Sequence, residues 1–329
     1  MSHFPVTNST LSAPHIGQYL VEHYGLSPAT TCTLFRTGIN HSYIVTDGTR
    51  KYVFRVYSFN WRTEQEIAEE LRLLNLLQAQ GVLVSYAVAD TQGELIQALP
   101  APEGPRYGVL FTYAEGKKVR DFSLETSYQL GTLMARLHLI TQGVTLDRVT
   151  YSLDTLVHLP YTYARIHFSE DNEEMQYIRK AGEYLRAEFE KIDNSKVRRG
   201  AIHLDLWYDN MHITDASEIT LFDFDFCGNG YLFYDLAYTT MQLYHTEPDK
   251  QKYQEKLKHF WAGYESVTPL DEEEKRWLPQ AGLAIWIFYL GVQSQRFDNW
   301  SNFFLSENYL KRYLGMAKEW LAYHQIQIN

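Results

Sequence analysis

Three polar residues near the middle of the chain have the types and the spacing that phosphoryl transfer requires. Asn210 follows Asp205 by five residues, and Asp223 follows Asn210 by thirteen. A hydroxyl nucleophile needs a carboxylate that orients it and accepts its proton, and a triphosphate needs Mg²⁺ held by hard oxygen ligands. We therefore expect Asp205 to act as the catalytic base, and Asn210 and Asp223 to bind the metal.

The elements around these residues change character along the chain. Residues 201–226 form a short stretch of predicted strands and loops, and this stretch is preceded by two predicted helices, at 127–140 and 171–192. From Tyr234 onward the pattern is again helical, and its most apolar run, 283–292, is too short to cross a bilayer and is expected to be a buried helix.

The first third of the chain has a different pattern, dominated by strands. After a predicted helix at 11–24, residues 31–57 are predicted to form strands, and a hairpin turn at Asp47-Gly48 joins the last of them, 51–57, to the strand before it. One amphipathic helix is predicted at 63–80, with Gly81 as its cap, and two further strands near 94–96 and 107–112. The lobe is therefore expected to have about five strands.

This order of elements predicts an α+β fold and argues against a doubly wound sheet, in which strands and helices would alternate throughout. We expect an N-terminal helical extension at 1–30, a β-rich nucleotide-binding lobe at 31–114, and a helical lobe at 115–329 that carries the catalytic loop and the acceptor pocket.

Several motifs occur in an order that resembles one enzyme family. The catalytic segment reads H-x-D-x-x-x-x-N from His203, residues 130–138 read L-G-x-x-x-A-x-L-H, and residues 235–237 read D-L-A. This set resembles the aminoglycoside phosphotransferase and choline kinase superfamily, which includes type II homoserine kinases and a bacterial stress-response Ser/Thr kinase. The resemblance extends over about residues 31–240 and implies a bilobal, protein-kinase-like fold that uses ATP and Mg²⁺.

The resemblance also implies a nucleotide site in the small lobe. Arg55 stands where kinases place a lysine and would pair with Glu70, whereas Lys51 is expected at the surface. The other residues expected to contact the nucleotide are Gly38 and Ser42 in the phosphate loop and Thr112 and Ala114 in the hinge.

Leu204 departs from the family pattern, which has glycine between the histidine and the aspartate. Because Leu204 has a side chain, we expect its backbone to adopt a conformation open to side chains. Structural roles are expected for the nearby polar residues: His203 holds the loop, Asp235 anchors the start of a helix, Asp209 is solvated, and Asp225 is structural or contacts the substrate.

The amino-acid composition of the chain argues against some classes of binding partner. The formal charge of −10 disfavours a nucleic-acid partner, and two cysteines suit a reducing cytoplasm without forming a disulfide framework. The N-terminal residues lack a basic region followed by an apolar one, so we expect neither a signal peptide nor a membrane partner. The sequence does not indicate an oligomeric state.

The sequence does not decide which class of molecule accepts the phosphate. Aromatic and acidic residues in the large lobe would suit a small, amine-bearing hydroxyl compound such as an amino alcohol, a homoserine-like amino acid or an aminoglycoside, although packing of the core explains most of these aromatics. The residues considered are Trp207, Tyr208, Tyr231, Tyr244, Trp286, Asp298 and Trp300. One alternative is a protein Ser/Thr kinase, which the short step of eleven positions from Asp223 to Tyr234 disfavours. The other is a pseudokinase, which the intact catalytic residues disfavour.

Overall fold

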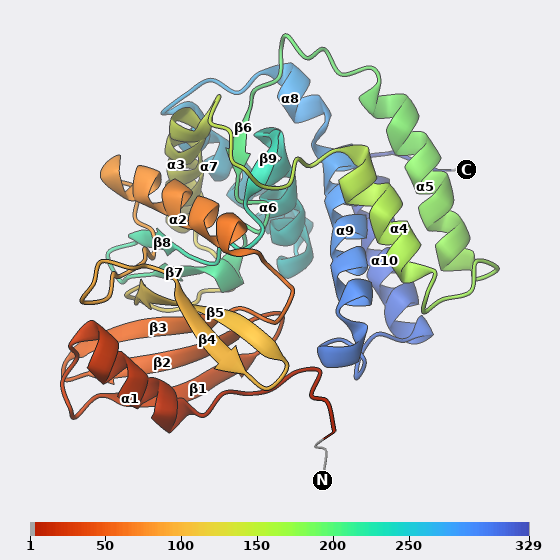
Figure 1. Ribbon diagram of the computed structural model, residues 1–329. Helices are drawn as coiled ribbons and strands as arrows, with labels where there is room; N and C mark the ends of the chain where they lie inside the picture. The colour runs from red at the N-terminus through yellow and green to blue at the C-terminus, as the bar shows by residue number, and fades with distance from the viewer. Residues whose placement is uncertain (1–3, 329) are drawn as a thin grey trace. The chain divides into compact units, whose positions relative to one another are not determined.

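The structure is a computed structural model that describes residues 4–328 (Figure 1). It divides into two compact units, of which the first ends at Ala114 and the second begins at Glu115. The first unit is built around a sheet and the second is mainly helical, so the predicted α+β class is confirmed.

The N-terminal unit contains one antiparallel sheet of five strands in the order β1-β2-β3-β5-β4. The two helices of this unit are α1 and α2, and α1 belongs to the same compact unit as the sheet. The bounds are α1 Ala13–Tyr24, β1 Thr31–Thr37, β2 His41–Asp47, β3 Arg50–Val56, α2 Glu64–Ala79, β4 Gln97–Ala101 and β5 Gly104–Thr112.

Side-chain alternation along β3 explains how the two helices cover the sheet. Phe54 and Val56 are fully buried in a cluster that includes Ile16 and Leu20 of α1. Arg55 lies between them in sequence and therefore points to the opposite face, where its side chain meets Glu70 of α2. The sheet thus holds Arg55 on the face that α2 covers.

The helix ends in this unit follow the signals in the sequence. Thr63 caps α2 through a reciprocal pair of hydrogen bonds with Glu66, and Gly81 follows the helix with a φ of 78°. Gly25 ends α1 in the left-handed conformation with a φ of 64°. The predicted helices are confirmed to within about two residues at these ends.

One predicted strand is displaced. The expected strand at 94–96 lies instead in a turn, and β4 begins at Gln97. The cause is Asp90, whose side chain accepts the backbone N–H groups of Gln92 and Glu94 and holds the chain in a tight turn. The strand starts only after that turn is complete.

The C-terminal unit consists of helices and two small antiparallel sheets, β6 with β9 and β7 with β8. Its helical elements are α3 Leu124–Thr141, η1 Asp154–His158, α4 Leu159–Ala164, α5 Glu173–Phe189, η2 Tyr208–Asn210, α6 Phe233–Thr246, α7 Lys250–Glu265, α8 Glu272–Arg276, α9 Leu278–Gln295, η3 Phe297–Asn299 and α10 Glu307–Tyr323. The strands are β6 Arg199–Ile202, β7 Met211–Ile213, β8 Ile219–Leu221 and β9 Gly228–Tyr231.

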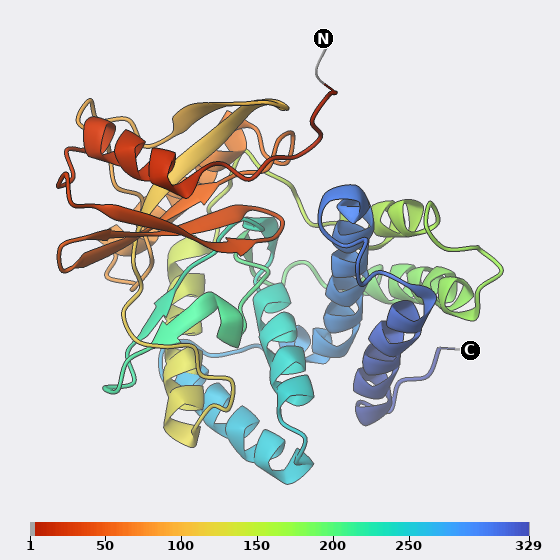
Figure 2. The same ribbon diagram turned by 90° about the horizontal axis from the view of Figure 1, so that it is seen from below.

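Helices α3 and α7 lie side by side (Figures 1 and 2), at a distance that only glycine permits. A Cβ atom on Gly131 of α3 would lie 2.0 Å from the carbonyl oxygen of Phe260, and one on Gly263 of α7 would lie 1.9 Å from that of Tyr128. The glycine of the L-G-x-x-x-A-x-L-H segment is therefore required for packing. This contact fixes the helix that carries His138.

The apolar run at 283–292 lies within α9, where most side chains are buried, as predicted. Within residues 4–328, no helix is long and apolar enough to cross a membrane.

Candidate active site

Asp205 and Asn210 are joined directly by hydrogen bonds. The side-chain amide of Asn210 donates to the Asp205 carboxylate at 2.7 Å and to the Asp205 carbonyl oxygen at 3.0 Å. Residues 208–210 form the short helix η2, which turns the chain back toward Asp205. Because the amide nitrogen is used in this way, the Asn210 side-chain oxygen remains the group that can bind a metal.

The β7–β8 hairpin brings Asp223 to the same place. Met211 pairs with Leu221, and the backbone N–H of Phe222 donates to the Asn210 carbonyl at 3.1 Å. Asp223 follows directly, with a φ of 64°. The structure therefore brings together all three residues from which the sequence predicts phosphoryl transfer.

The environment of Asp205 raises its pKa to about 7. Burial is the main cause and the nearby negative charge of Asp223 adds to it, whereas hydrogen bonds from Tyr289, Tyr238 and Asn210 oppose the shift. A carboxylate with a pKa near neutrality is suited to accept a proton in catalysis.

No group of three or more His, Cys, Asp or Glu side chains suited to a metal occurs among residues 4–328. Asn210 and Asp223 supply an amide and a carboxylate oxygen, which is the kind of incomplete set that Mg²⁺ accepts when phosphate oxygens and water complete its octahedron. The two residues thus fit Mg²⁺ bound to a nucleotide.

The backbone conformation of Leu204 differs from the one that the sequence predicts. Its φ is 66°, in the left-handed region that favours glycine, and its side chain is fully buried. Asp235 explains how this conformation is held, because its carboxylate accepts the backbone N–H groups of Leu204 at 2.6 Å and of His203 at 3.0 Å. Surrounding bonds therefore fix a conformation that a leucine alone would avoid.

Asp235 also differs from its predicted role. It lies in the first turn of α6 but anchors the catalytic loop rather than the start of its own helix, which has no side-chain cap. His138 of α3 lies 3.5 Å from its carboxylate and contacts Tyr264 of α7 at 2.8 Å. The D-L-A and L-G-x-x-x-A-x-L-H segments are thus joined beneath the catalytic loop.

His203 is buried and holds the loop, as predicted. The backbone N–H of Asp205 donates to His203 Nδ1 at 3.2 Å, so Nε2 carries the proton that faces the Phe222 carbonyl at 3.3 Å. Burial lowers the pKa of His203, which keeps the ring neutral.

Asp209 and Asp225, two aspartates near the catalytic residues, are held by contacts within the protein. Asp209 forms an ion pair with Lys118 at 2.6 Å and is only 21% exposed at its side chain, so the prediction of a solvated loop residue was wrong. Asp225 is buried, with 2% of its surface exposed, and its carbonyl accepts a hydrogen bond from Arg148. A mainly structural role for Asp225 therefore remains the better interpretation.

In the N-terminal unit, Arg55 and Glu70 form the predicted ion pair, at 2.9 Å. Glu70 is fully buried and also accepts a hydrogen bond from the Tyr57 hydroxyl at 2.9 Å. Ser42 is the cross-strand partner of Arg55, so both side chains lie on the same face of the sheet. Lys51 is exposed, as expected.

The phosphate loop is fixed by a residue that the sequence did not indicate. Gly38 lies in the bend between β1 and β2, and the Ser58 hydroxyl donates to the carbonyl of Ile39 in the same bend. The backbone N–H of Ser58 donates in turn to the Asn40 side chain at 3.2 Å. Both bonds hold the loop close to the end of β3.

Thr112 does not offer a free backbone N–H for adenine. That group donates to the Tyr86 carbonyl at 2.9 Å, and the Thr112 carbonyl accepts the Ser85 hydroxyl. Ala114, the other expected hinge residue, follows β5, and its contact with adenine stays a prediction.

The structure places the residues considered for the acceptor in different parts of the C-terminal unit. Tyr244 and Trp286 are packed in the helical core, and the Trp286 indole donates to the Tyr313 carbonyl at 2.8 Å. Trp207 and Tyr208 follow Asp205 directly, and Asp298 and Trp300 lie in and after η3. Tyr231 lies on β9, under the guanidinium of Arg199.

Sequence analysis missed Tyr238 and Tyr289, whose phenol groups lie close enough to Asp205 to affect the pKa of its carboxylate. The Tyr289 hydroxyl donates to the carbonyl of Leu204 at 3.4 Å. The two tyrosines come from α6 and α9, at 33 and 84 residues from Asp205 in the chain. Each is one aromatic residue among many in an apolar helix, so no sequence pattern distinguished them.

Comparisons with known proteins agree with this site. The model of the phosphotransferase enzyme family matches residues 31–270. An uncharacterized protein of Deinococcus radiodurans is 28% identical over 98% of this chain and 93% of its own length. A homoserine kinase of Methylobacillus glycogenes is 28% identical over 75% of each chain.

Two solved structures share the fold. The amicoumacin kinase hAmiN, in complex with AMP-PNP, Ca²⁺ and Ami, aligns with a TM-score of 0.77 and 21% identity, over 94% of this chain and 93% of that one. A microcompartment-associated aminopropanol kinase aligns with a TM-score of 0.75 and 22% identity, over 96% of this chain and all of that one. The match over most of the chain, together with the Asp205–Asn210–Asp223 arrangement, shows that the protein belongs to the phosphotransferase enzyme family and has its protein-kinase-like fold.

Proposed function

We propose that this phosphotransferase moves the γ-phosphate of ATP to a hydroxyl group of a small, amine-bearing compound. Asp205 orients the hydroxyl and accepts its proton, and Asn210 and Asp223 hold the metal. Arg55, positioned by Glu70, binds the phosphates, and the backbone near Ala114 binds adenine. Mg²⁺, when bound, supplies neutralising charge to the phosphates.

The observation that carries this proposal is the arrangement of Asp205, whose carboxylate accepts the Asn210 amide at 2.7 Å, beside Asp223 at the end of the β7–β8 hairpin. The pKa of Asp205, raised to about 7, agrees with the role of a base. A structural carboxylate that accepts hydrogen bonds has a lowered pKa as a rule, whereas a general base works best near the operating pH. The site therefore keeps a base able to take a proton at neutral pH.

The amine-bearing class is supported by the surroundings of Asp205. The phenol groups of Tyr238 and Tyr289 lie at its carboxylate, and aromatic rings beside negative charge attract ammonium groups. Homoserine kinases among the relatives, and the aminopropanol kinase among the similar structures, are named for substrates with both an amine and a hydroxyl.

A protein acceptor is less well supported. The segment between Asp223 and Tyr234 contains β9, whose residues Gly228–Tyr231 pair with β6. Four of the ten residues between Asp223 and Tyr234 are therefore paired in a sheet, and the short segment leaves little chain on which a peptide could dock.

The test is ADP release from Mg·ATP in the presence of amino alcohols, hydroxy amino acids, aminoglycosides and a generic protein substrate. We expect stimulation by one class of small hydroxyl compound. Asp223→Ala should weaken the binding of Mg·ATP, and Asp215→Ala, at an exposed loop residue, is the matched control. Stimulation by the protein substrate alone, or an unchanged nucleotide affinity in Asp223→Ala, would overturn the assignment.

A further inference from the structure

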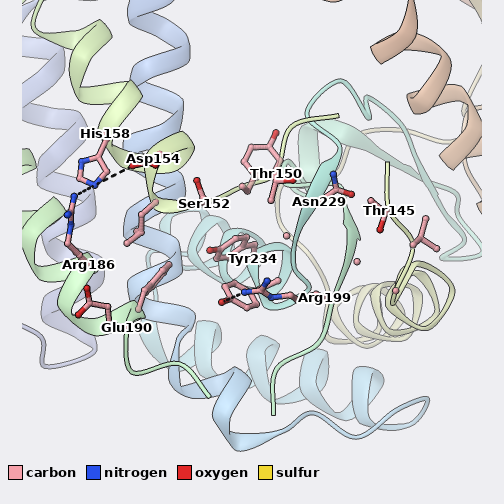
Figure 3. Close-up of a pocket in the computed structure, with 18 residues that line it drawn as sticks. Thr145, Thr150, Ser152, Asp154, His158, Arg186, Glu190, Arg199, Asn229 and Tyr234 are labelled. Atoms are coloured by element: carbon pink, nitrogen blue, oxygen red, sulfur yellow. Dashed lines mark hydrogen bonds and ion pairs between the residues drawn. The ribbon is translucent and has the colours of Figure 1, made fainter. Parts of the chain in front are cut away.

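A cavity lies in the C-terminal unit, and none of the three catalytic residues lines it. It has a volume of about 660 Å³ and is formed by the 143–154 loop, η1, the end of α5 and the β6–β9 sheet (Figure 3). Cavities of several hundred cubic ångströms are the size that binds small molecules. The proposed phosphotransferase reaction does not use this cavity.

Arg199 supplies positive charge to the cavity. Its guanidinium lies 4.3 Å from the centre of the Tyr231 ring and donates to the Tyr231 hydroxyl and to Asn194. Within residues 4–328, no carboxylate lies within ion-pair distance of Arg199. In an acidic protein, an arginine that is balanced only by neutral partners retains donors for an anion.

Tyr234 supplies an unused polar group. The residue is 1% exposed and lines the cavity, and among the described residues its hydroxyl has no hydrogen-bond partner. The hydroxyl is open to the cavity, so a polar group of a ligand can take the place of water as its partner. The aromatic ring of Phe189, stacked near Tyr234, adds a flat apolar wall.

The acidic residues of the cavity lie at its other end. Figure 3 shows Asp154 and Glu190 beside Arg186 and His158, away from Arg199 and Tyr234. His158 contacts Arg186 at 2.9 Å and lies 4.0 Å from Asp154. The end with Arg199 and Tyr234 is therefore the end suited to an anion.

We propose that this cavity is an effector site for a small phosphorylated molecule with a planar apolar body. Its phosphate binds Arg199 and the Tyr234 hydroxyl, and its body lies against Phe189. Phosphate is favoured over a carboxylate because a phosphate monoester has three free oxygens, so two can meet the guanidinium fork while the third accepts from the hydroxyl.

The position of the cavity in the chain connects it to the catalytic loop. Arg199 begins β6, which ends at Ile202, directly before His203. Tyr234 is the neighbour of Asp235, whose carboxylate holds the backbone of His203 and Leu204. A ligand that fixes Arg199 and Tyr234 therefore steadies both segments that position Asp205.

Calorimetric titration of the full chain with phenyl phosphate tests the site, with Mg·ADP present at saturation to occupy the nucleotide site. We expect one saturable site, bound about tenfold more weakly in Arg199→Gln, because a charge-assisted hydrogen bond is worth roughly that factor. Tyr234→Phe should also weaken binding. Arg179→Gln, at an exposed arginine of α5 outside the cavity, should not.

Three further titrations identify the ligand class. Inorganic phosphate and benzoate should both bind more weakly than phenyl phosphate, and benzyl alcohol should not bind. No saturable binding of phenyl phosphate at millimolar concentration, or equal binding by wild type and Arg199→Gln, would overturn the proposal. Benzoate binding more tightly than phenyl phosphate would refute the phosphorylated class.

Hydrogen exchange tests the connection to the catalytic loop without measuring activity. Phenyl phosphate should slow exchange of the backbone amides of His203 and Leu204, and exchange that does not change would refute the effector role. Asp205→Asn should bind phenyl phosphate like the wild type, so a failure of the proposed kinase activity and a failure of this site are separate results.

Discussion

The carboxylate of Asp235 accepts the backbone N–H of Leu204 across 2.6 Å, and so one side chain of α6 fixes the residue that precedes the catalytic base. The replacement Asp235→Asn keeps the shape but loses the charge and one acceptor oxygen. We expect a loss of about 1–3 kcal/mol in the free energy of unfolding, the usual worth of hydrogen bonds to a charged group.

The same replacement should lower kcat while nucleotide affinity stays near that of the wild type, because Asp235 acts through Asp205 and does not bind nucleotide. Denaturant unfolding and steady-state kinetics measure the two effects. Asp271→Asn, which removes the cap of the exposed helix α8, is the control for a general loss of stability. A kcat equal to that of the control would contradict the positioning role.

Leu204 allows a test of backbone strain. The left-handed conformation costs a residue with a side chain about 1–2 kcal/mol, but the buried leucine side chain contributes about 1.5–3 kcal/mol. Leu204→Ala should lose the stabilisation from the buried side chain but keep the cost of the left-handed backbone. Leu204→Gly should lose that stabilisation and also remove the backbone cost. We therefore predict that the glycine variant unfolds at higher denaturant concentration than the alanine variant, and the reverse order would show that the φ of 66° is not strained.

The raised pKa of Asp205 predicts two effects of pH. Its pKa in the folded protein is about 7, above the ordinary value of 3.8, so the folded state binds the proton more tightly than the unfolded state does. Stability without metal should therefore fall as pH rises from about 4 to about 7. In the same metal-free conditions, Asp205→Asn should be more stable than the wild type at pH about 8, by roughly 1–4 kcal/mol.

Activity should follow the opposite trend, since the base works only when it has lost its proton. We expect kcat/KM to rise with pH, with a midpoint at a pH of about 7. Bound Mg²⁺ should shift this midpoint to a somewhat lower pH. Thermal unfolding and initial rates across pH 5–9 measure both trends. A stability profile that is the same in the wild type and in Asp205→Asn would show that the pKa is not raised.

The buried pair of Arg55 and Glu70 predicts a graded effect of substitution. Arg55→Met removes the guanidinium that neutralises the buried Glu70 carboxylate at 2.9 Å, and we expect a loss of about 3 kcal/mol or more in the free energy of unfolding. Arg55→Lys should lose less stability but still raise the KM for ATP, because an ammonium group cannot reproduce the planar fork.

The matched control for this pair is Arg72→Met. Arg72 pairs with Glu69 at 2.8 Å, but its side chain is 48% exposed, so we expect a loss below about 1 kcal/mol. Equal losses in Arg55→Met and Arg72→Met would contradict the importance of the buried pair.

The sequence predicted the reacting groups because their spacing alone brings them together. A short turn returns Asn210 to Asp205, and the β7–β8 hairpin then places Asp223 beside them. Arg55 and Glu70 were predicted from the resemblance to the family, and the structure pairs them because a strand and the following helix of one lobe carry them.

The parts that the sequence did not predict depend on distant contacts. The φ of Leu204 is held by Asp235, thirty-one residues away, and Tyr238 and Tyr289 reach Asp205 from helices that pack around it. The shift of β4 to Gln97 comes from a turn at Asp90 that outweighs the local strand pattern. Local propensity contains none of this information.

The most direct test of the central claim is a single-turnover measurement of γ-phosphate transfer from labelled Mg·ATP to the best small hydroxyl acceptor, in the wild type and in Asp205→Asn. A positioned general base contributes about 10²–10⁴-fold, so the variant should be slower by that factor while its affinity for ATP is unchanged. Transfer at the wild-type rate in Asp205→Asn would contradict the account.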